Sequence, residues 1–334
     1  MGLHPIPRGS PMTPPSSDAR AAALPAAEAA RGQAGEQARD PALGIAYMVI
    51  AAGLFSVMDA LIKWLGPSYP TMQIVFFRSL FAFVPLAIFM MRSGALGSLA
   101  TRHPMGHVWR AVIGFVAMSS FFYAYARMPL ANVVALSFAA PLFITALSVP
   151  LLGESVGIRR WSAVVVGFLG VIIMVRPDAS IFESVALVPL AGSVFYALAM
   201  IYVRKLSKTE SSAAIVFYYT LACTLISAGF MPFQWVAPDT TDLMLLIALG
   251  CVGGLAQIFM TNAFRNGPAA LIAPFDYVTM VWVVMLGYFI WGDIPDVNIW
   301  IGVAIVIGSG VYIARREGKL GLRRGVARPL QPKR

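Results

Sequence analysis

Residues 151–174 read LLGESVGIRRWSAVVVGFLGVIIM, and residues 289–313 read FIWGDIPDVNIWIGVAIVIGSGVYI. With a shift of 139 residues the two stretches align at three positions: Gly153 with Gly292, Glu154 with Asp293, and Trp161 with Trp300. Earlier in the chain, Ala131 aligns with Ala270 at the same shift. Several coincidences at one shift indicate that the two halves of the chain arose by internal duplication.

The composition of the chain indicates that it is embedded in a membrane. Of its 334 residues, 59% are hydrophobic and 12% are charged, and the mean hydropathy is +0.76. Soluble domains have roughly 45–50% apolar and about 25% charged residues. So few charges could not cover a soluble fold with this much apolar surface. The formal net charge of +10 does not indicate nucleic-acid binding, because the basic residues lie in short loops and tails, as membrane orientation requires.

The apolar runs predict an all-α membrane protein with ten transmembrane helices. A helix needs ~20 residues to cross the hydrocarbon core, whereas barrel strands are short and alternate in polarity. Residues 1–41, rich in Ala, Pro, Gly and Ser, are predicted to be a disordered tail, and residues 315–334 a basic tail. The ten predicted spans are 42–63, 71–91, 107–126, 130–149, 161–175, 183–203, 212–232, 243–262, 269–290 and 297–314.

The distribution of Lys and Arg predicts that both termini are cytoplasmic. With this orientation 21 basic residues lie inside, among them Arg110 in the third-span entry loop, and 3 lie outside. Arg78 is placed within a span. Because each half, 42–176 and 183–314, contains five spans, an odd number, the second half must enter the membrane from the opposite face. The sequence therefore predicts two inverted five-helix repeats, an architecture common among secondary transporters.

No feature of the sequence predicts a cofactor or a metal. Cys223 and Cys251 lie within apolar segments without the spacing of metal ligands. The three histidines are assigned to the N-terminal tail and to the loop before the third span, which leaves none in the apolar spans. The sequence leaves the oligomeric state open, a homodimer being among the options.

The membrane part, about residues 42–316, resembles the EamA-type branch of the drug/metabolite transporter superfamily. The resemblance is carried by Lys63 and by four segments: FFRSLFAF (76–83), PLANVVALSFAAPLFITALSVPLLGE (129–154), RRWSAVVVGFLGVIIMVRP (159–177) and the weaker second copy NGPAALIAPFDYVTMVWVVMLGYFIWGD (266–293). It implies a carrier of small organic metabolites in a bacterial inner membrane. The substrate would cross by alternating access, through a central cavity between two five-helix halves.

The segment MDALIKWLGPSYPTMQIVFFR (58–78) is similar to members that transport S-adenosylmethionine, and less clearly to riboflavin carriers. The segment IAPFDY (272–277) departs from the commoner family pattern by carrying an acid. This departure implies a substrate with a positive charge.

Charged side chains within the spans are the first candidates for a site, because each costs ~2.5–3.5 kcal/mol at the bilayer centre on insertion scales. Asp59 precedes Lys63 by four residues, a spacing that favours an ion pair on one helix face. Asp59 could instead line the cavity and bind substrate or a proton. Arg78 either pairs with Asp59 or with backbone carbonyls, or it binds an anionic group of the substrate.

Asp276 follows Pro274 by two residues in the ninth span. Pro274 removes a backbone hydrogen bond and predicts a locally broken helix that lines water. There a carboxylate can exchange protons or attract a cation. The alternative is an ion pair with Arg265. Pro141 predicts a similar break in the fourth span.

Neutral and aromatic residues give weaker indications. Gln257 lies in the middle of the eighth span, and Tyr277 and Trp282 could stack on a flat ligand, although aromatic residues more often pack between helices. Glu154 and Asp293 are predicted to cap the helices that follow them. Four small residues are predicted to mark close helix contacts: Gly167, Gly170, Gly250 and Gly254.

The sequence therefore favours a secondary transporter of a cationic or zwitterionic metabolite, with the lipid bilayer and a small molecule as its partners. The absence of a GxxxxGK[ST] loop argues against ATP hydrolysis by this chain. An intramembrane enzyme would need a nucleophile with a base, or two facing aspartates. Asp59 and Asp276 are predicted toward opposite faces of the membrane, too far apart for such a dyad. A channel or a scaffold would not require an inverted repeat.

Overall fold

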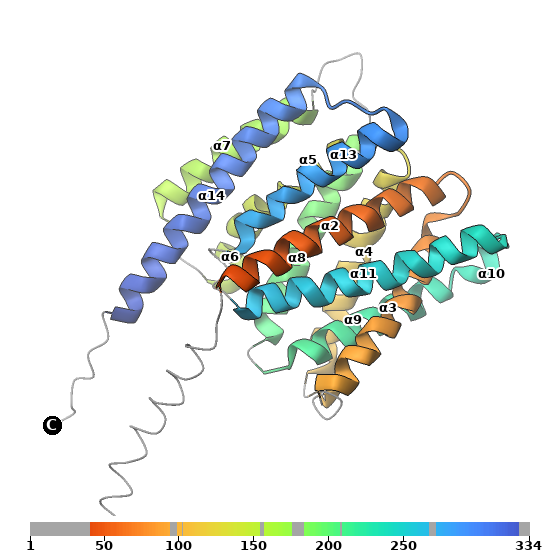
Figure 1. The fold of residues 1–334 in the computed structure, drawn as a ribbon. Coiled ribbons are helices and arrows are strands. Elements are labelled where there is room, and N and C mark those ends of the chain that lie inside the picture. Colours follow the sequence, from red (N-terminus) through yellow and green to blue (C-terminus); the bar gives the residue numbers. More distant parts are fainter. Residues whose placement is uncertain are drawn as a thin grey trace, which may run out of the picture. The chain divides into compact units, whose positions relative to one another are not determined.

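The computed structural model describes residues 41–93, 99–101, 103–153, 157–175, 184–207, 209–266 and 272–326, and every element within these ranges is helical (Figure 1). Residues 1–40, and with them nearly all of the predicted N-terminal tail, lie outside the described residues, as does Glu154. The elements are α2 (Pro41–Leu65), α3 (Thr71–Ser93), α4 (Pro104–Tyr125), α5 (Leu130–Ser137), α6 (Ala140–Leu152), α7 (Ile158–Val175), η2 (Ser184–Ala186), α8 (Leu187–Leu206), α9 (Ser212–Ala228), α10 (Met231–Gln234), α11 (Thr240–Asn266), η3 (Ala273–Val278), α13 (Thr279–Trp291) and α14 (Val297–Val326).

Six helical segments are long and apolar enough to cross a membrane: Ala42–Leu65, Thr71–Arg92, Pro104–Tyr125, Leu130–Leu152, Leu187–Leu206 and Thr240–Phe264. Four shorter apolar helices of 10–17 residues accompany them: Trp161–Val175, Ala213–Ala228, Phe275–Trp291 and Val297–Ile313. The prediction of an all-helical membrane protein is confirmed for the described part of the chain. α14 continues past residue 314, so the first residues of the predicted basic tail are helical.

Two apolar segments are broken where prolines predicted it. The fourth predicted span consists of α5 and α6, separated by Phe138 and Ala139, and Pro141 lies in the first turn of α6. The ninth begins as the 3-10 helix η3, with Pro274 in its first turn, before α13 starts at Thr279. A proline nitrogen cannot donate the hydrogen bond that would continue the preceding helix.

The two breaks meet each other in space. Phe138, in the first break, and Tyr277, in the second, pack edge to face with ring centroids 4.9 Å apart. These two residues are separated by 139 positions in the sequence, the shift that aligns the two halves. Equivalent residues that touch are expected where a two-fold axis relates two copies.

The helix ends repeat as well. α6 ends at Gly153 with φ 66°, and α13 ends at Gly292 with φ 71°. They are the two glycines with positive φ in the described chain. Only glycine adopts this left-handed conformation without steric cost, and it commonly ends helices in this way. The aligned glycines therefore have the same structural role.

The contacts between helices link the first half of the chain to the second. α2 packs on α11, and α8 packs on α4, while α3 contacts α9, α5 contacts α13 and α7 contacts α14 (Figure 1). α7 and α14 approach each other closely at Gly170. A Cβ added to this glycine would lie only 2.9 Å from the carbonyl oxygen of Gly302. Gly250 and Gly254 face the α3 backbone in the same way, at Phe77 and Ala82. The predicted packing roles of these glycines are confirmed.

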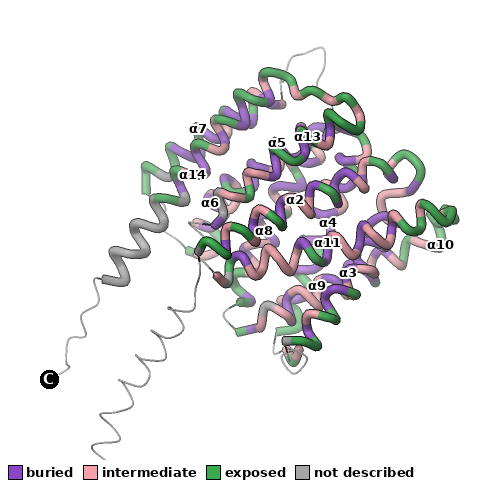
Figure 2. Tube along the Cα trace, viewed as in Figure 1, coloured by how far each residue is buried: buried purple, intermediate pink, exposed green. Residues whose placement is uncertain are grey.

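The burial pattern is that of a protein in lipid. Large apolar side chains such as Leu169, Ile172 and Phe289 are 53%, 53% and 76% exposed, whereas Asp59, Arg78 and Arg110 are 5%, 8% and 9% exposed (Figure 2). In water the opposite distribution would be favoured. The helices therefore enclose a few charged side chains within a largely apolar core, and these side chains belong to the candidate site.

Candidate functional site

Asp59 lies in the last third of α2 and is buried. Its carboxylate accepts a hydrogen bond from the hydroxyl of Tyr125, at the end of α4, and Tyr125 is itself buried. Arg78 and Asp276 lie close enough to Asp59 to interact with it electrostatically. Sequence reasoning did not select Tyr125, because a tyrosine at a helix end is typical of an interfacial aromatic residue.

Lys63 does not pair with Asp59. Its ammonium forms an ion pair with Asp293, which follows α13, and lies 4.6 Å from the centre of the Trp291 ring. The local spacing favoured Asp59, but α13 packs along α2 and brings Asp293 to the end of that helix. The predicted capping role of Asp293 is also wrong, because α14 begins only at Val297. Asp293 instead ties α13 to α2.

The connection after α2 is fixed to the start of α11. The Tyr69 hydroxyl donates a hydrogen bond to Asp242 Oδ2 at 2.7 Å. Gln73 donates to the carbonyl of Val236 at 2.7 Å and accepts from its N–H at 2.9 Å. Burial, followed by the hydrogen bond to Asp242, raises the pKa of Tyr69 to about 12. The phenol therefore stays protonated at ordinary pH and remains able to donate.

Arg78 lies in the second turn of α3 and is buried. Its Nε makes no hydrogen bond, and neither described ion pair includes its guanidinium. Asp59 interacts with it electrostatically but is not close enough for an ion pair. Arg78 also acts electrostatically on the thiol of Cys223 and the hydroxyl of Tyr219, both on α9. The guanidinium thus lies between α2 and α9.

Arg110 belongs to the interior, although the sequence assigned it to a loop. It lies in α4 with 9% of its surface exposed, and its guanidinium carbon is 4.0 Å from the centre of the Tyr219 ring. Gly114 leaves room for it, since a Cβ there would overlap Arg110 Nη1. Neither Nε nor Nη1 of Arg110 has a hydrogen-bond partner. The predicted span, 107–126, already contained Arg110, but the residue was counted with the basic residues of the inside loop and so was not considered as a charge within the membrane.

Asp276 lies in η3, at the second helix break. Its carboxylate accepts a hydrogen bond from the hydroxyl of Thr279. The residue is exposed, yet it interacts electrostatically with Asp59, Tyr125 and Tyr196. Because η3 packs on α2, the charges of Asp59 and Asp276 influence each other; that the two acids are too far apart for a catalytic dyad stays a prediction. The side chain of Arg265 is outside the described residues.

The other predicted candidates, Tyr277, Trp282 and Gln257, lie on η3, α13 and α11. Tyr277 is half-buried between Phe138 and Gly310, where a Cβ on the glycine would overlap the phenol oxygen. Trp282, 38% exposed, lies over Gly53 of α2, with Cε2 at 3.5 Å from a Cβ built there. Gln257 is half-buried on α11. Trp282 lies along α2 rather than at the charged cluster.

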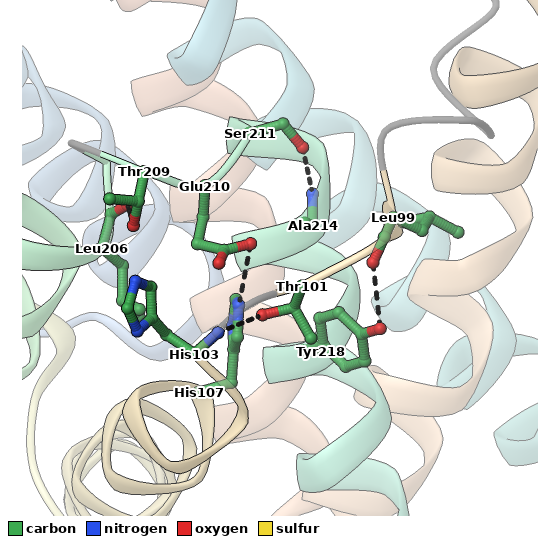
Figure 3. A network of polar contacts seen from close by, with 10 residues as sticks. All are labelled: Leu99, Thr101, His103, His107, Leu206, Thr209, Glu210, Ser211, Ala214 and Tyr218. Atoms are coloured by element: carbon green, nitrogen blue, oxygen red, sulfur yellow. Dashed lines mark hydrogen bonds and ion pairs between the residues drawn. The ribbon is translucent and has the colours of Figure 1, made fainter.

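A second polar group occupies the start of α4, where the sequence placed no buried histidine. His107 is 5% exposed, and its Nε2 lies 3.7 Å from Glu210 Oε2, in the connection between α8 and α9 (Figure 3). The Tyr218 ring lies 4.7 Å from the imidazole and donates its hydroxyl to the Leu99 carbonyl at 3.0 Å. Among the described residues no cluster of three or more His, Cys, Asp or Glu is placed to hold a metal ion.

Two carboxylates and two guanidiniums thus gather inside an apolar helical bundle, contributed by α2, α3, α4 and η3. Side chains of this kind within membrane spans are typical of pathways for ions and charged substrates. Combined with helices broken at matching positions, they define the class of membrane carriers with internal repeats.

The sequence signature of the EamA-like transporter family matches this chain twice, at residues 42–176 and 184–315, and the chain belongs to that family. Known relatives carry names of transporters, not of enzymes. An S-adenosylmethionine uptake transporter of Rickettsia prowazekii is 29% identical over 276 residues, covering 83% of this chain and 94% of the relative.

A pseudopaline exporter of Pseudomonas aeruginosa is 31% identical over 276 residues, covering 82% of this chain and 96% of the relative. A riboflavin transporter of Rhizobium johnstonii is 27% identical over 278 residues, covering 82% and 92%. A solved crystal structure is similar in fold, with a TM-score of 0.58 at 18% identity, over 82% of this chain and 98% of that chain.

Proposed function

We propose that this chain is a secondary transporter that moves a small cationic or zwitterionic organic metabolite by alternating access, and that S-adenosylmethionine is among its substrates. The observation that carries the proposal is a carboxylate buried on α2, Asp59, with a second carboxylate, Asp276, on η3, which packs against α2. Two carboxylates in one polar interior attract a positive charge. The names of relatives from three bacteria, each given to a carrier of a small metabolite, support the same class of substrate.

The proposed architecture is ten membrane spans in two inverted five-helix repeats, residues 42–176 and 183–314, followed by a basic tail at 315–334. The contact of Phe138 with Tyr277 at the 139-residue shift supports a two-fold relation between the halves. The excess of Lys and Arg on one side supports cytoplasmic termini in a bacterial inner membrane.

In this proposal Asp59 and Asp276 bind the positive group of the substrate or the coupling proton. Asp276 is suited to meet the substrate first, because it is exposed while Asp59 is buried. Arg78 offsets the negative charge of Asp59. Tyr277, Gln257 and Trp282 are further candidates for contact with the substrate, and an aromatic ring can stack on a flat ligand.

Riboflavin, an amino acid or a drug are alternative cargoes within the same family, and the riboflavin transporter relative makes riboflavin the first to test. An intramembrane enzyme would need a base beside a nucleophile. His107, the buried histidine of α4, is paired with Glu210 instead.

Uptake by the purified protein in proteoliposomes tests the proposal. Labelled S-adenosylmethionine, riboflavin and a set of amino acids are supplied with and without a pH gradient across the vesicle membrane. Saturable uptake of S-adenosylmethionine, competed by other cationic or zwitterionic metabolites, is the expected result. Exclusive uptake of riboflavin or of an anionic sugar phosphate would overturn the proposed substrate class.

A further inference from the structure

Among the described residues neither Arg78 nor Arg110 forms an ion pair, although Asp59 interacts electrostatically with Arg78. Both side chains are more than nine-tenths buried. Arg78 Nε and Arg110 Nε and Nη1 make no hydrogen bond, and within the described chain the ion pairs are Lys63 with Asp293 and His107 with Glu210. Leaving a buried guanidinium uncompensated costs several kcal/mol. A functional reason for retaining two of them is therefore required.

α3 and α4, which carry the two guanidiniums, both pack on α9. Each guanidinium acts electrostatically on the Cys223 thiol and on the Tyr219 hydroxyl of that helix. The Tyr219 ring holds Arg110 by a cation–π contact at 4.0 Å. Its hydroxyl donates to the Gly114 carbonyl at 3.3 Å, which fixes the ring. Arg110 is therefore oriented without using its own donors.

Two acids belong to the same part of the bundle. Tyr196 of α8 interacts electrostatically with Arg110 and with Asp276, and Asp59 interacts with Arg78. The guanidiniums therefore come from α3 and α4 and the carboxylates from α2 and η3. A molecule bearing a cationic group and an anionic group a few bonds apart complements both kinds of charge.

We propose that Arg78 and Arg110 form a carboxylate-binding subsite, so that the transported molecules carry a carboxylate as well as a positive group. The Nε and Nη1 of Arg110 are buried N–H donors without a partner, and a carboxylate oxygen is an acceptor that a guanidinium binds by a charge-assisted hydrogen bond. The inference rests on the proposed transport function and narrows its substrate class to amino-acid-like zwitterions.

Matched ligand pairs test the subsite. S-adenosylmethionine is compared with decarboxylated S-adenosylmethionine, and methionine with 3-(methylthio)propylamine, since within each pair only the carboxylate differs. Binding to the purified protein in detergent is measured by the ligand-dependent rise of the unfolding temperature. In the wild type we expect the carboxylate-bearing member to bind about tenfold tighter or more, as charge-assisted hydrogen bonds allow.

Three variants locate the effect. In Arg110→Gln the affinity ratio within each pair is expected to fall to about one. Gly114→Ala keeps the charge but displaces the guanidinium, since its Cβ overlaps Nη1, and is expected to lower the ratio even if Arg110→Gln does not fold. Arg92→Gln is the control, because Arg92 is exposed at the end of α3. It should keep the wild-type ratio.

The subsite is overturned if both members of each pair bind the wild type equally, if neither carboxylate-bearing probe binds, or if both Arg110→Gln and Gly114→Ala keep the full ratio. These outcomes are independent of transport. A protein that carries only riboflavin in proteoliposomes loses the proposed function, yet the methionine pair still decides whether the arginines bind a carboxylate.

Discussion

The two segments that match the family, residues 42–176 and 184–315, share their backbone but not their charges. Both contain a break followed by a helix that ends at a left-handed glycine, Gly153 or Gly292. At the 139-residue shift, however, Asp276 corresponds to Ser137 and Arg110 to Leu249. α9, which partners α3, contains no charged residue. The two segments therefore resemble each other at their helix ends and differ in the charged residues that they contribute to the candidate site.

The largest effect on uptake is expected from a substitution of Asp276, whereas a substitution of its counterpart Ser137 should have little effect. In proteoliposomes Asp276→Asn is expected to reduce uptake at least about tenfold, as loss of a charged contact implies, and to remove the response to a pH gradient. Ser137→Ala loses only a hydroxyl that donates to the Val134 carbonyl, so uptake should remain near the wild-type rate. A pH response that persists in Asp276→Asn would leave this carboxylate a structural role only.

The contact between α7 and α14, which joins the two segments, can be weakened by one methyl group. A Cβ on Gly302 would lie 2.6 Å from the Gly170 carbonyl oxygen, whereas one on Gly308 meets nothing within 4 Å. Gly302→Ala is therefore expected to destabilise the protein by about 1–3 kcal/mol. Gly308→Ala on the same helix should be neutral or stabilising by up to ~1 kcal/mol. Thermal unfolding in detergent measures both, and equal midpoints would contradict the close approach.

The matching helix ends offer a direct test of equivalence. A Cβ on Gly153 or Gly292 meets no atom within 4 Å, so alanine there is opposed only by the left-handed backbone. Each substitution should cost about 1 kcal/mol, and the double variant should show the sum. The two single variants should lower the free energy of unfolding equally. A difference of more than about 0.5 kcal/mol, larger than usual additivity errors, would show that the two helix ends contribute unequally to stability.

The smallest effect is expected for the ion pair between Lys63 and Asp293. Their side chains are 14% and 27% exposed, so solvent screens the attraction. A double-mutant cycle with Lys63→Gln and Asp293→Asn should give a coupling energy of about 0.5–1 kcal/mol. The coupling should decrease at high salt. No measurable coupling would indicate that the contact of Lys63 with Trp291 alone orients the lysine.

Much of the scaffold could be predicted from the sequence, because its signals are local. The length of apolar runs marks the spans, and Pro141 and Pro274 mark the breaks, since a missing N–H acts on its own helix. The aligned glycines and tryptophans revealed the repeat. None of these inferences required knowledge of which helices touch.

The partners within the site could not be predicted, because they depend on contacts between distant segments. Asp293 is 230 positions from Lys63, and the helical rule for neighbours four apart pointed to Asp59 instead. Arg110 lies near the start of its helix, where a basic residue normally anchors at the membrane surface. The one local signal for it was Gly114, a small residue one turn later, which leaves space beside α4 for its guanidinium.

The contact of Phe138 with Tyr277 has a consequence for how the halves can move. Two equivalent side chains that touch lie on either side of the two-fold axis that relates one half to the other. Exchange of inward- and outward-facing shapes leaves that axis in place. A short cross-linker between cysteines at these two positions is therefore compatible with continued turnover. The same linker between positions 63 and 293, which lie in contact at the ends of α2 and α13, is expected to slow or stop transport.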